Sequence, residues 1–169
     1  MDSLLQAARD AGARYLGLQQ RIHPTCFTCG PERDEGDGLR VFAGQVEGAP
    51  AGHVAGVWRP DPAFADAEGL VPTEVIWAAL DCPGFFAWVV KAGRHGALLG
   101  TMTGEVIRRP RAGEACIVSA WPLVRDGRKE TAGAALFSAD GELLARAHQV
   151  WIMSPPPPTA ETAAVTASV

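Results

Sequence analysis

The sequence predicts an α+β fold in which an antiparallel sheet of about six strands wraps around one hydrophobic helix. The helix is predicted by an almost wholly apolar run from Val75 to Leu80, of the kind that is buried on every side. The sheet is predicted by short apolar or alternating segments on both sides of this run. Asp-Gly turns at 126–127 and 140–141 join the last segments as hairpins.

The N-terminal part begins with an expected amphipathic helix over 3–20, which forms a helical extension of residues 1–22 before the main domain. Two strands and two loops follow, each bounded by glycine or proline. They are expected as a loop over 24–37, strands over 38–44 and 53–58, and a second loop over 59–70.

The central helix is expected to begin at Pro72 and Thr73, with Thr73 as its cap and Glu74 as an acid in its first turn. Cys82-Pro83-Gly84 is expected to break this helix, because proline and glycine are the strongest helix breakers. From Phe85 to about Lys91 the helix is expected to resume at an angle, since proline can open a helical turn.

Four strands in a meander are expected after the helix, over 97–109, 115–124, 129–138 and 142–153. The more apolar face of the last strand is expected to meet the core. Its residues are Leu143, Ala145, Ala147, Gln149, Trp151 and Met153. The main domain therefore covers 23–154, and the proline-rich tail over 155–169 is expected to be extended or disordered.

The composition is that of one ordinary globular domain. Of the 169 residues, 47% are hydrophobic and 20% charged, which is enough apolar material for a proper core. The net charge of −4 and the isoelectric point near 5.5 argue against nonspecific nucleic-acid binding. No signal-peptide pattern and no apolar stretch of about 20 residues is evident, so a cytoplasmic protein without a membrane partner is expected.

Asp81 is the residue whose presence most needs an explanation. It follows the apolar run, where an unpaired buried carboxylate costs several kcal/mol. One interpretation is a stop signal, because aspartate is a poor helix former and Cys82-Pro83-Gly84 comes next. The other interpretation is a functional carboxylate that faces a cavity.

Four cysteines are present, and two of them are spaced as a pair. Cys26-x-x-Cys29, with His23 upstream, could be half of a zinc site or a redox motif. No second pair follows at finger spacing and Gly30-Pro31 would break a helix, so a structural turn is favoured and no metal is predicted. A zinc site shared between subunits remains open. Cys82 and Cys116 are interpreted as small core residues.

These elements resemble the hotdog-fold thioesterase superfamily over roughly residues 23–153. Four segments carry the resemblance: 26–30 with 38–40, the helix 71–84, the strand 100–107 and the closing hairpin 134–147. The resemblance implies a homodimer or a dimer of dimers, with sheets joined edge to edge and active sites at the subunit interface. It also implies an acyl-coenzyme A or acyl-carrier thioester as substrate and no other cofactor.

In the branch that resembles the phenylacetate-pathway enzymes, His-Gly-Gly begins the helix and a catalytic acid lies two turns later. Those three positions fall here on Pro72, Thr73 and Glu74, and the acid falls on Asp81. The resemblance thus implies that Asp81 acts as general base or nucleophile. The resemblance also implies that the Thr73 backbone N–H takes the oxyanion role of the first glycine. Glu74 is expected to assist, to compete as the base, or only to favour the helix dipole.

Further side chains are expected to contact the substrate. Basic residues suited to coenzyme A phosphates form two patches, although each patch could equally be solvated turn residues. They are Arg108, Arg109 and Arg111, and Arg125, Arg128 and Lys129. Aromatic residues expected at the acyl pocket, or else in the core, are Trp77, Phe85, Phe86 and Trp88.

Two alternatives to hydrolysis stay open. One is a non-catalytic binder of acyl-thioesters or small ligands on the same fold, because a fold alone does not prove activity. The other is a hotdog dehydratase or lyase, which typically needs a catalytic histidine beside an acid. It is less favoured because the central helix has no histidine. The four histidines are scattered at His23, His53, His95 and His148, and His148 is expected at the sheet surface.

Overall fold

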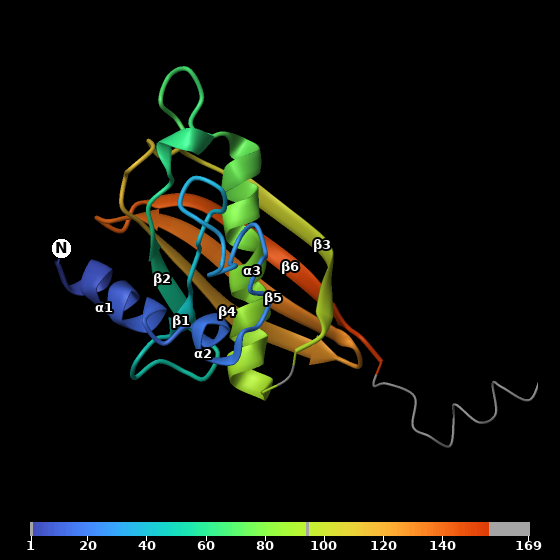
Figure 1. The fold of residues 1–169 in the computed structure, drawn as a ribbon. Helices are drawn as coiled ribbons and strands as arrows, with labels where there is room; N and C mark the ends of the chain where they lie inside the picture. Colours follow the sequence, from blue (N-terminus) through green and yellow to red (C-terminus); the bar gives the residue numbers. More distant parts are fainter. Residues whose placement is uncertain (1, 94, 156–169) are drawn as a thin grey trace, which may run out of the picture.

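One antiparallel sheet and one long helix organise the molecule, as expected (Figure 1). The computed structural model describes residues 2–93 and 95–155. The six strands lie in the order β1-β2-β4-β5-β6-β3, and every neighbouring pair is antiparallel. Their bounds are β1 Gly44–Gln45, β2 Val54–Trp58, β3 Ala97–Val106, β4 Cys116–Asp126, β5 Lys129–Ser138 and β6 Leu143–Met153.

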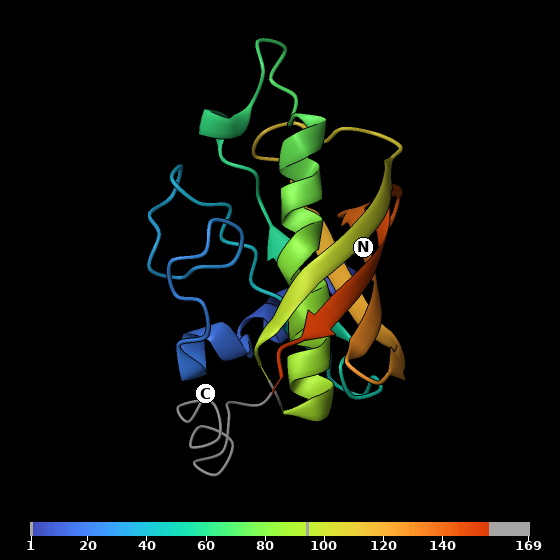
Figure 2. The same cartoon turned by 90° about the vertical axis from the view of Figure 1, so that its right-hand side faces the viewer.

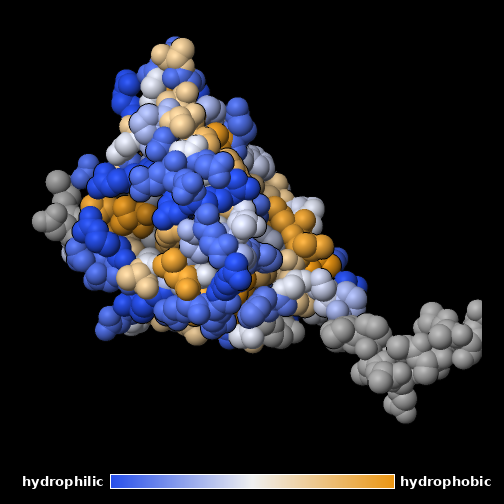
Figure 3. Space-filling model, in the orientation of Figure 1, coloured by the Kyte–Doolittle hydropathy of each residue, from blue (hydrophilic) through white to orange (hydrophobic). Residues whose placement is uncertain are grey.

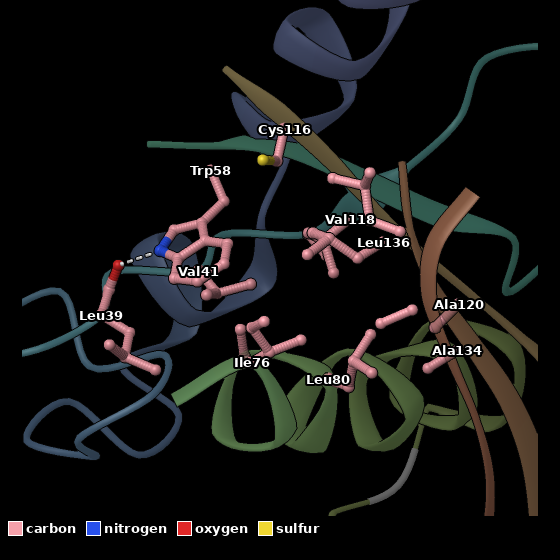
Figure 4. Packing of buried hydrophobic residues seen from close by; sticks show 14 of the residues in the cluster. Leu39, Val41, Trp58, Ile76, Leu80, Cys116, Val118, Ala120, Ala134 and Leu136 are labelled. Carbon is pink, nitrogen blue, oxygen red and sulfur yellow. Dashed lines mark hydrogen bonds between the residues drawn. The ribbon is translucent and has the colours of Figure 1, made fainter. Parts of the chain in front are cut away.

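Helix α3 (Thr73–Ala92) lies against the inner face of this sheet. Seen from the side, α3 runs between the sheet and the loop that follows α2 (Figure 2). Ile76 and Leu80 of α3 meet Val118 and Leu136 of the sheet in the main core (Figure 4). Among the described residues α3 is long and apolar enough to cross a membrane, but 56% of its most apolar window is buried, as in a core helix.

The expected break at Cys82-Pro83-Gly84 is wrong, because α3 continues through Pro83 as one helix of 20 residues. Proline removes one backbone donor from a helix and normally kinks or ends it. Here the helix is held by burial and by side-chain hydrogen bonds from outside. Gln149 Nε2 donates to the carbonyl oxygens of Leu80 and Asp81, which lie three and two positions before the proline. The helix ends at Gly93, whose φ of 65° is the left-handed conformation typical of a helix end.

The N-terminal extension is two helices rather than one. Helix α1 (Asp2–Gly12) and the short α2 (Leu16–Gln20) are separated by a turn in which Tyr15 is buried. Ala8 and Ala11 of α1 pack with Ala55 and Ile117 of the sheet. These two strand residues alternate with those that face α3, so α1 covers the outer face of the sheet.

The expected strand over 38–44 is also wrong, since only Gly44 belongs to a strand there. The backbone of this segment pairs with a loop: Leu39 N–H donates to Phe27 O at 2.8 Å, and Val41 N–H to Thr28 O at 2.9 Å. A 3-10 turn, Pro62–Phe64, lies in the second loop and is capped by Asp61. The tail prediction falls outside the described residues from position 156 onward.

The last strand confirms most of its predicted inner face. Ala145, Gln149 and Trp151 of β6 are buried, whereas His148 is exposed on the outer face. Leu144 is buried as well, because the pairing of β5 with β6 is irregular between Leu136 and Phe137. The sequence pattern therefore placed the strand correctly and missed only this local shift.

Candidate active site around Asp81

The middle of α3 carries a carboxyl group with one oxygen that no described residue satisfies. Asp81 is half-buried, and its Oδ1 is buried without a hydrogen-bond partner among the described residues. Since nearly all buried polar atoms in proteins are hydrogen-bonded, such an oxygen calls for a reason. Burial, and then the nearby Cys26 thiol group, raise the pKa of Asp81 from its ordinary value to about 6. A carboxylate of this kind is a better proton acceptor than an exposed one.

A loop after α2 covers the turn of α3 that carries Asp81. Thr28 Oγ1 donates to the carbonyl oxygen of Ala78 at 3.0 Å, and the sulfur atoms of Cys26 and Cys82 lie 3.6 Å apart. His23 packs its ring on Phe85, with ring centroids 5.2 Å apart. The loop is thus attached to α3 on both sides of Asp81 along the chain.

The Cys26-x-x-Cys29 segment is a turn, as predicted, but it has a partner that the sequence did not indicate. The sulfur atoms of Cys26, Cys29 and Cys82 all lie within 4.8 Å of one another. Cys82 is half-buried and packs against the second core cluster, which agrees with its interpretation as a core residue, and its sulfur also faces the loop. Cys116 is fully buried in the main core, which confirms the interpretation made for it. His23 is not part of the three-cysteine group.

On the sheet side, Gln149 of β6 fixes the same turn of α3. Its amide nitrogen lies 2.7 Å from the carbonyl oxygen of Leu80 and 2.9 Å from that of Asp81. Its amide oxygen accepts a hydrogen bond from Trp151 Nε1 at 3.1 Å. A Cβ atom on Gly84 would overlap this amide oxygen, so the glycine lets α3 approach β6 closely.

The start of α3 differs from the prediction in its cap. Pro72, not Thr73, occupies the N-cap position, and it makes no side-chain capping bond. Thr73 and Glu74 are both exposed in the first turn. Asp81 lies eight positions after Thr73, which at 1.5 Å per residue is about 12 Å along the helix axis. One chain therefore does not bring the Thr73 amide and the Asp81 carboxylate to a single reacting carbonyl.

The four aromatic residues lie at different depths. Phe85, Phe86 and Trp88 are buried with Tyr15 and Trp151 in a second core cluster. Trp88 Nε1 donates to Thr131 O at 2.9 Å, which ties the later part of α3 to β5. Trp77 is only half-buried, and its indole lies beside Gly104 of β3, 3.2 Å from where a Cβ would stand. Of the four, Trp77 lies nearest to the start of α3 and borders an edge strand.

The arginines of the first basic patch lie in the turn after β3, next to the segment that enters α3. Val71 N–H donates to Pro110 O at 2.9 Å and fixes this neighbourhood. Arg108 is engaged by Glu114 at 2.9 Å and by Glu142 at 3.0 Å. The other two arginines have fewer side-chain partners. Arg109 forms an ion pair with Asp66 at 2.8 Å, and exposed Arg111 donates to Glu68 O at 3.3 Å. In the second patch, Arg125 pairs with Glu130 and Arg128 donates to Met153 O.

Thr28, Cys82 and Gln149 hold this site together and were not predicted to do so. Gln149 offered a signal, because it is the polar member of an otherwise apolar strand face. Thr28 and Cys82 offered none, since their partners are about 50 residues away in the sequence and depend on the tertiary fold.

Comparison with solved structures decides what this architecture is. A thioesterase superfamily protein superposes with a TM-score of 0.58 at 18% identity, over 68% of this chain and 54% of that chain. The chain has the hotdog fold. It spans only about half the length of that first protein, so the similarity concerns the hotdog domain.

Two further solved structures extend the comparison. A hypothetical thioesterase from Streptococcus pneumoniae TIGR4, solved with coenzyme A, has a TM-score of 0.58 at 9% identity, over 65% of this chain and 84% of that one. The E. coli PaaI protein from the phenylacetic acid degradation operon has a TM-score of 0.55 at 10% identity, over 62% of this chain and 78% of that one. No protein-family model and no curated protein matches the sequence.

Proposed function

We propose that the protein hydrolyses acyl-coenzyme A thioesters and that Asp81 is its catalytic carboxylate. The observation that carries the proposal is the buried, unpartnered Oδ1 of Asp81 in the middle of the central helix of a hotdog fold. Hotdog proteins of similar structure include thioesterase superfamily members, one of them solved with coenzyme A. Coenzyme A enters as part of the substrate, and the chemistry needs no further cofactor.

In this mechanism the ionised Asp81 carboxylate acts in one of two ways. It takes a proton from a water molecule that attacks the thioester carbonyl carbon, or it attacks that carbon itself and forms a mixed anhydride, which water then hydrolyses. Either route expels the coenzyme A thiolate and develops negative charge on the carbonyl oxygen. The Thr73 backbone N–H, at the positive end of the α3 dipole, stabilises that charge. Exposed Glu74 is the neighbouring acid that would assist there.

The distance of about 12 Å between Thr73 and Asp81 requires two copies of the chain for one complete site. Within the described residues, β3 offers the means of association. It is a ten-residue strand at the end of the sheet, so one side of its backbone is unpaired. Leu98 on β3 is 72% exposed, and a hydrophobic area lies on the right-hand side of the molecule, where β3 runs (Figure 3). We infer a homodimer joined at β3, in which each active site takes Asp81 from one copy and the Thr73 amide from the other.

Substrate recognition follows the same layout. The turn bearing Arg108, Arg109 and Arg111 adjoins the segment that leads into α3, where the oxyanion donor lies. Arg111 is the most available of the three for a phosphate, because its recorded partner is a carbonyl oxygen and not a carboxylate. Trp77 borders β3 and would contact the acyl group first. Phe85, Phe86 and Trp88 would form the deeper wall of the acyl pocket.

The test is release of coenzyme A from short, long and aromatic acyl-coenzyme A substrates at pH 8. We expect Asp81→Asn to lower kcat by at least about 100-fold, because general-base catalysis contributes about 10²–10⁴-fold. Asp10→Asn, on exposed α1, is the matched control and should leave turnover unchanged. Turnover that survives in Asp81→Asn would exclude the mechanism.

A second candidate is a hotdog protein that binds acyl-thioesters without hydrolysing them. One feature favours it: Thr73 and Glu74 occupy the positions where the resembling enzymes have two glycines. Glycine allows a substrate to approach the backbone more closely than a branched or charged side chain does. Isothermal titration with a non-hydrolysable acyl-coenzyme A analogue separates the two. Binding by a folded dimer, without turnover of any thioester in the panel, would establish the binder and overturn the hydrolase.

A further inference from the structure

Three thiol groups from two distant parts of the chain meet beside α3. Cys26 and Cys29 belong to the turn after α2, and Cys82 belongs to α3. Their sulfur atoms lie within 4.8 Å of one another, and those of Cys26 and Cys82 are 3.6 Å apart. Cys29 is buried and the other two are half-buried, so the group lies just beneath the surface.

These spacings suit a tetrahedral metal ion with sulfur ligands. A Zn²⁺–S bond is about 2.3 Å long, so two thiolates on one tetrahedral zinc lie about 3.8 Å apart. The recorded Cys26–Cys82 spacing is already close to that value, and contraction of the remaining pairs by about 1 Å at most would complete three of the four positions. Soft thiolate ligands favour zinc over the hard cations magnesium and calcium.

The backbone around the thiols fixes their positions before any ion binds. The turn is closed by its own backbone, because the Cys26 N–H donates to His23 O at 3.1 Å. Gly30 closes the turn: its N–H donates to Cys26 O at 2.8 Å, and a Cβ there would lie 2.5 Å from Cys26 N. Tyr15 is buried and donates its hydroxyl to Cys29 O at 2.9 Å. An outer shell of hydrogen bonds is what orients the ligands of protein metal sites.

We propose that Cys26, Cys29 and Cys82 form a zinc site that fastens the loop to α3 next to Asp81. Each cysteine binds through its sulfur and releases its thiol proton to solvent, so three protons leave as three Zn–S bonds form. The fourth position is left for a water molecule or another ligand. The site is independent of thioester hydrolysis, because it rests on the thiols alone.

The experiment uses the full chain without a polyhistidine tag, kept reduced, stripped with a chelator and then dialysed against Zn²⁺. Elemental analysis and native mass spectrometry should find one zinc per chain, and the melting temperature should rise with added zinc. Replacement by Co²⁺ should give the sulfur-to-cobalt charge-transfer absorption of a thiolate site. A chain that retains no zinc, or a cobalt complex without that absorption, would overturn the proposal.

Variants test the ligand set directly. Cys82→Ala should weaken zinc binding by at least about 100-fold, since loss of an outer-shell partner alone costs about 10–100-fold. Cys116→Ala removes a buried thiol outside the group and should bind zinc as the unaltered chain does. Equal binding by both variants would show that zinc is held elsewhere. Should Cys82→Ala fail to fold, Cys26→Ala on the loop provides the same comparison. The zinc content of the unaltered chain still decides whether the site exists. None of these measurements depends on whether the protein hydrolyses thioesters.

Discussion

Gln149 and Asp81 meet at the same turn of α3, and they differ in how their polar atoms are satisfied. Gln149 is fully buried, and its amide makes hydrogen bonds to Leu80, Asp81 and Trp151. Asp81 is half-buried, and its Oδ1 has no partner among the described residues. A buried polar group that is fully bonded contributes to structure, whereas one without a partner costs stability. The contrast identifies Gln149 as a residue that fixes this turn of α3, and it is the reason why we propose Asp81 as the catalytic carboxylate.

The largest effect on stability is expected from Gln149→Leu. The substitution leaves the buried Trp151 N–H without a partner, which costs about 1–3 kcal/mol. The carbonyl groups of Leu80 and Asp81 keep their helical hydrogen bonds but each lose a second one, worth about 1 kcal/mol, so we expect a total loss of about 3 kcal/mol. Urea unfolding followed by circular dichroism measures it. Gln45→Leu is the control: its amide also bonds backbone carbonyls, but in a half-exposed turn where water replaces them, so about 1 kcal/mol is expected. Equal losses in the two variants would refute the structural role of Gln149.

A smaller loss, about 2 kcal/mol, is expected from Gly84→Ala. The added methyl group overlaps Gln149 Oε1 and lies 2.9 Å from its Cδ, and overpacking of a core costs about 1–3 kcal/mol. Alanine gains about 1 kcal/mol of helix propensity in return, which reduces the net effect. In a Gln149→Ala background the overlap disappears, so the same substitution should be nearly neutral. A loss that is equal in both backgrounds would mean that Gln149 is not the neighbour that requires glycine.

The sequence predicted the sheet, its hairpins and the central helix because local signals specify them. Hydrophobic periodicity and two Asp-Gly turns gave β4, β5 and β6 to within a few residues. The errors came where tertiary contacts outweigh local preference. Pro83 sits inside a continuous helix, and residues 38–43 pair with the cysteine turn instead of forming a strand.

For the candidate site, the position of Asp81 could be predicted and its surroundings could not. A lone acid beside an apolar run is visible in the sequence. The contact between Cys26 and Cys82 joins residues 56 positions apart and exists only in the folded chain. The separation of Thr73 from Asp81 could have been predicted, because it follows from helical rise alone. This separation is the argument for the dimer that we propose.

The stability of the Asp81→Asn variant tests the Asp81 side of the comparison with Gln149. The expected change in the free energy of unfolding is smaller than for Gln149→Leu or Gly84→Ala. The amide removes a desolvated charge, so at pH 8 we expect the free energy of unfolding to stay within about 1 kcal/mol of the original or to rise. Asp66→Asn is the matched control. Its carboxylate accepts hydrogen bonds from the N–H groups of Glu68 and Leu70 and from Arg109, so stability should fall. A clear loss of stability in Asp81→Asn would mean that Asp81 has a structural partner, contrary to the contrast with Gln149.

The smallest effect on stability is expected from substitution of Glu114. Unlike Asp81, this carboxylate has hydrogen-bond partners for both of its oxygens. The hydrogen bonds from Arg108, and then from the Arg111 N–H, hold the pKa of Glu114 below its ordinary value of 4.5. A lowered pKa in the folded state means that the stabilisation is present above pH 4.5 and is lost as pH falls through the folded value. At pH 7 the free energy of unfolding of the original chain should exceed that of Glu114→Gln by less than about 1 kcal/mol. The difference is small because solvent screens the partly exposed ion pair of Glu114 with Arg108. Urea unfolding at pH 7 and pH 3 should show this difference shrinking in acid. A difference that is constant across that range would mean that hydrogen bonding, and not the charge of Glu114, holds the turn that carries the arginines.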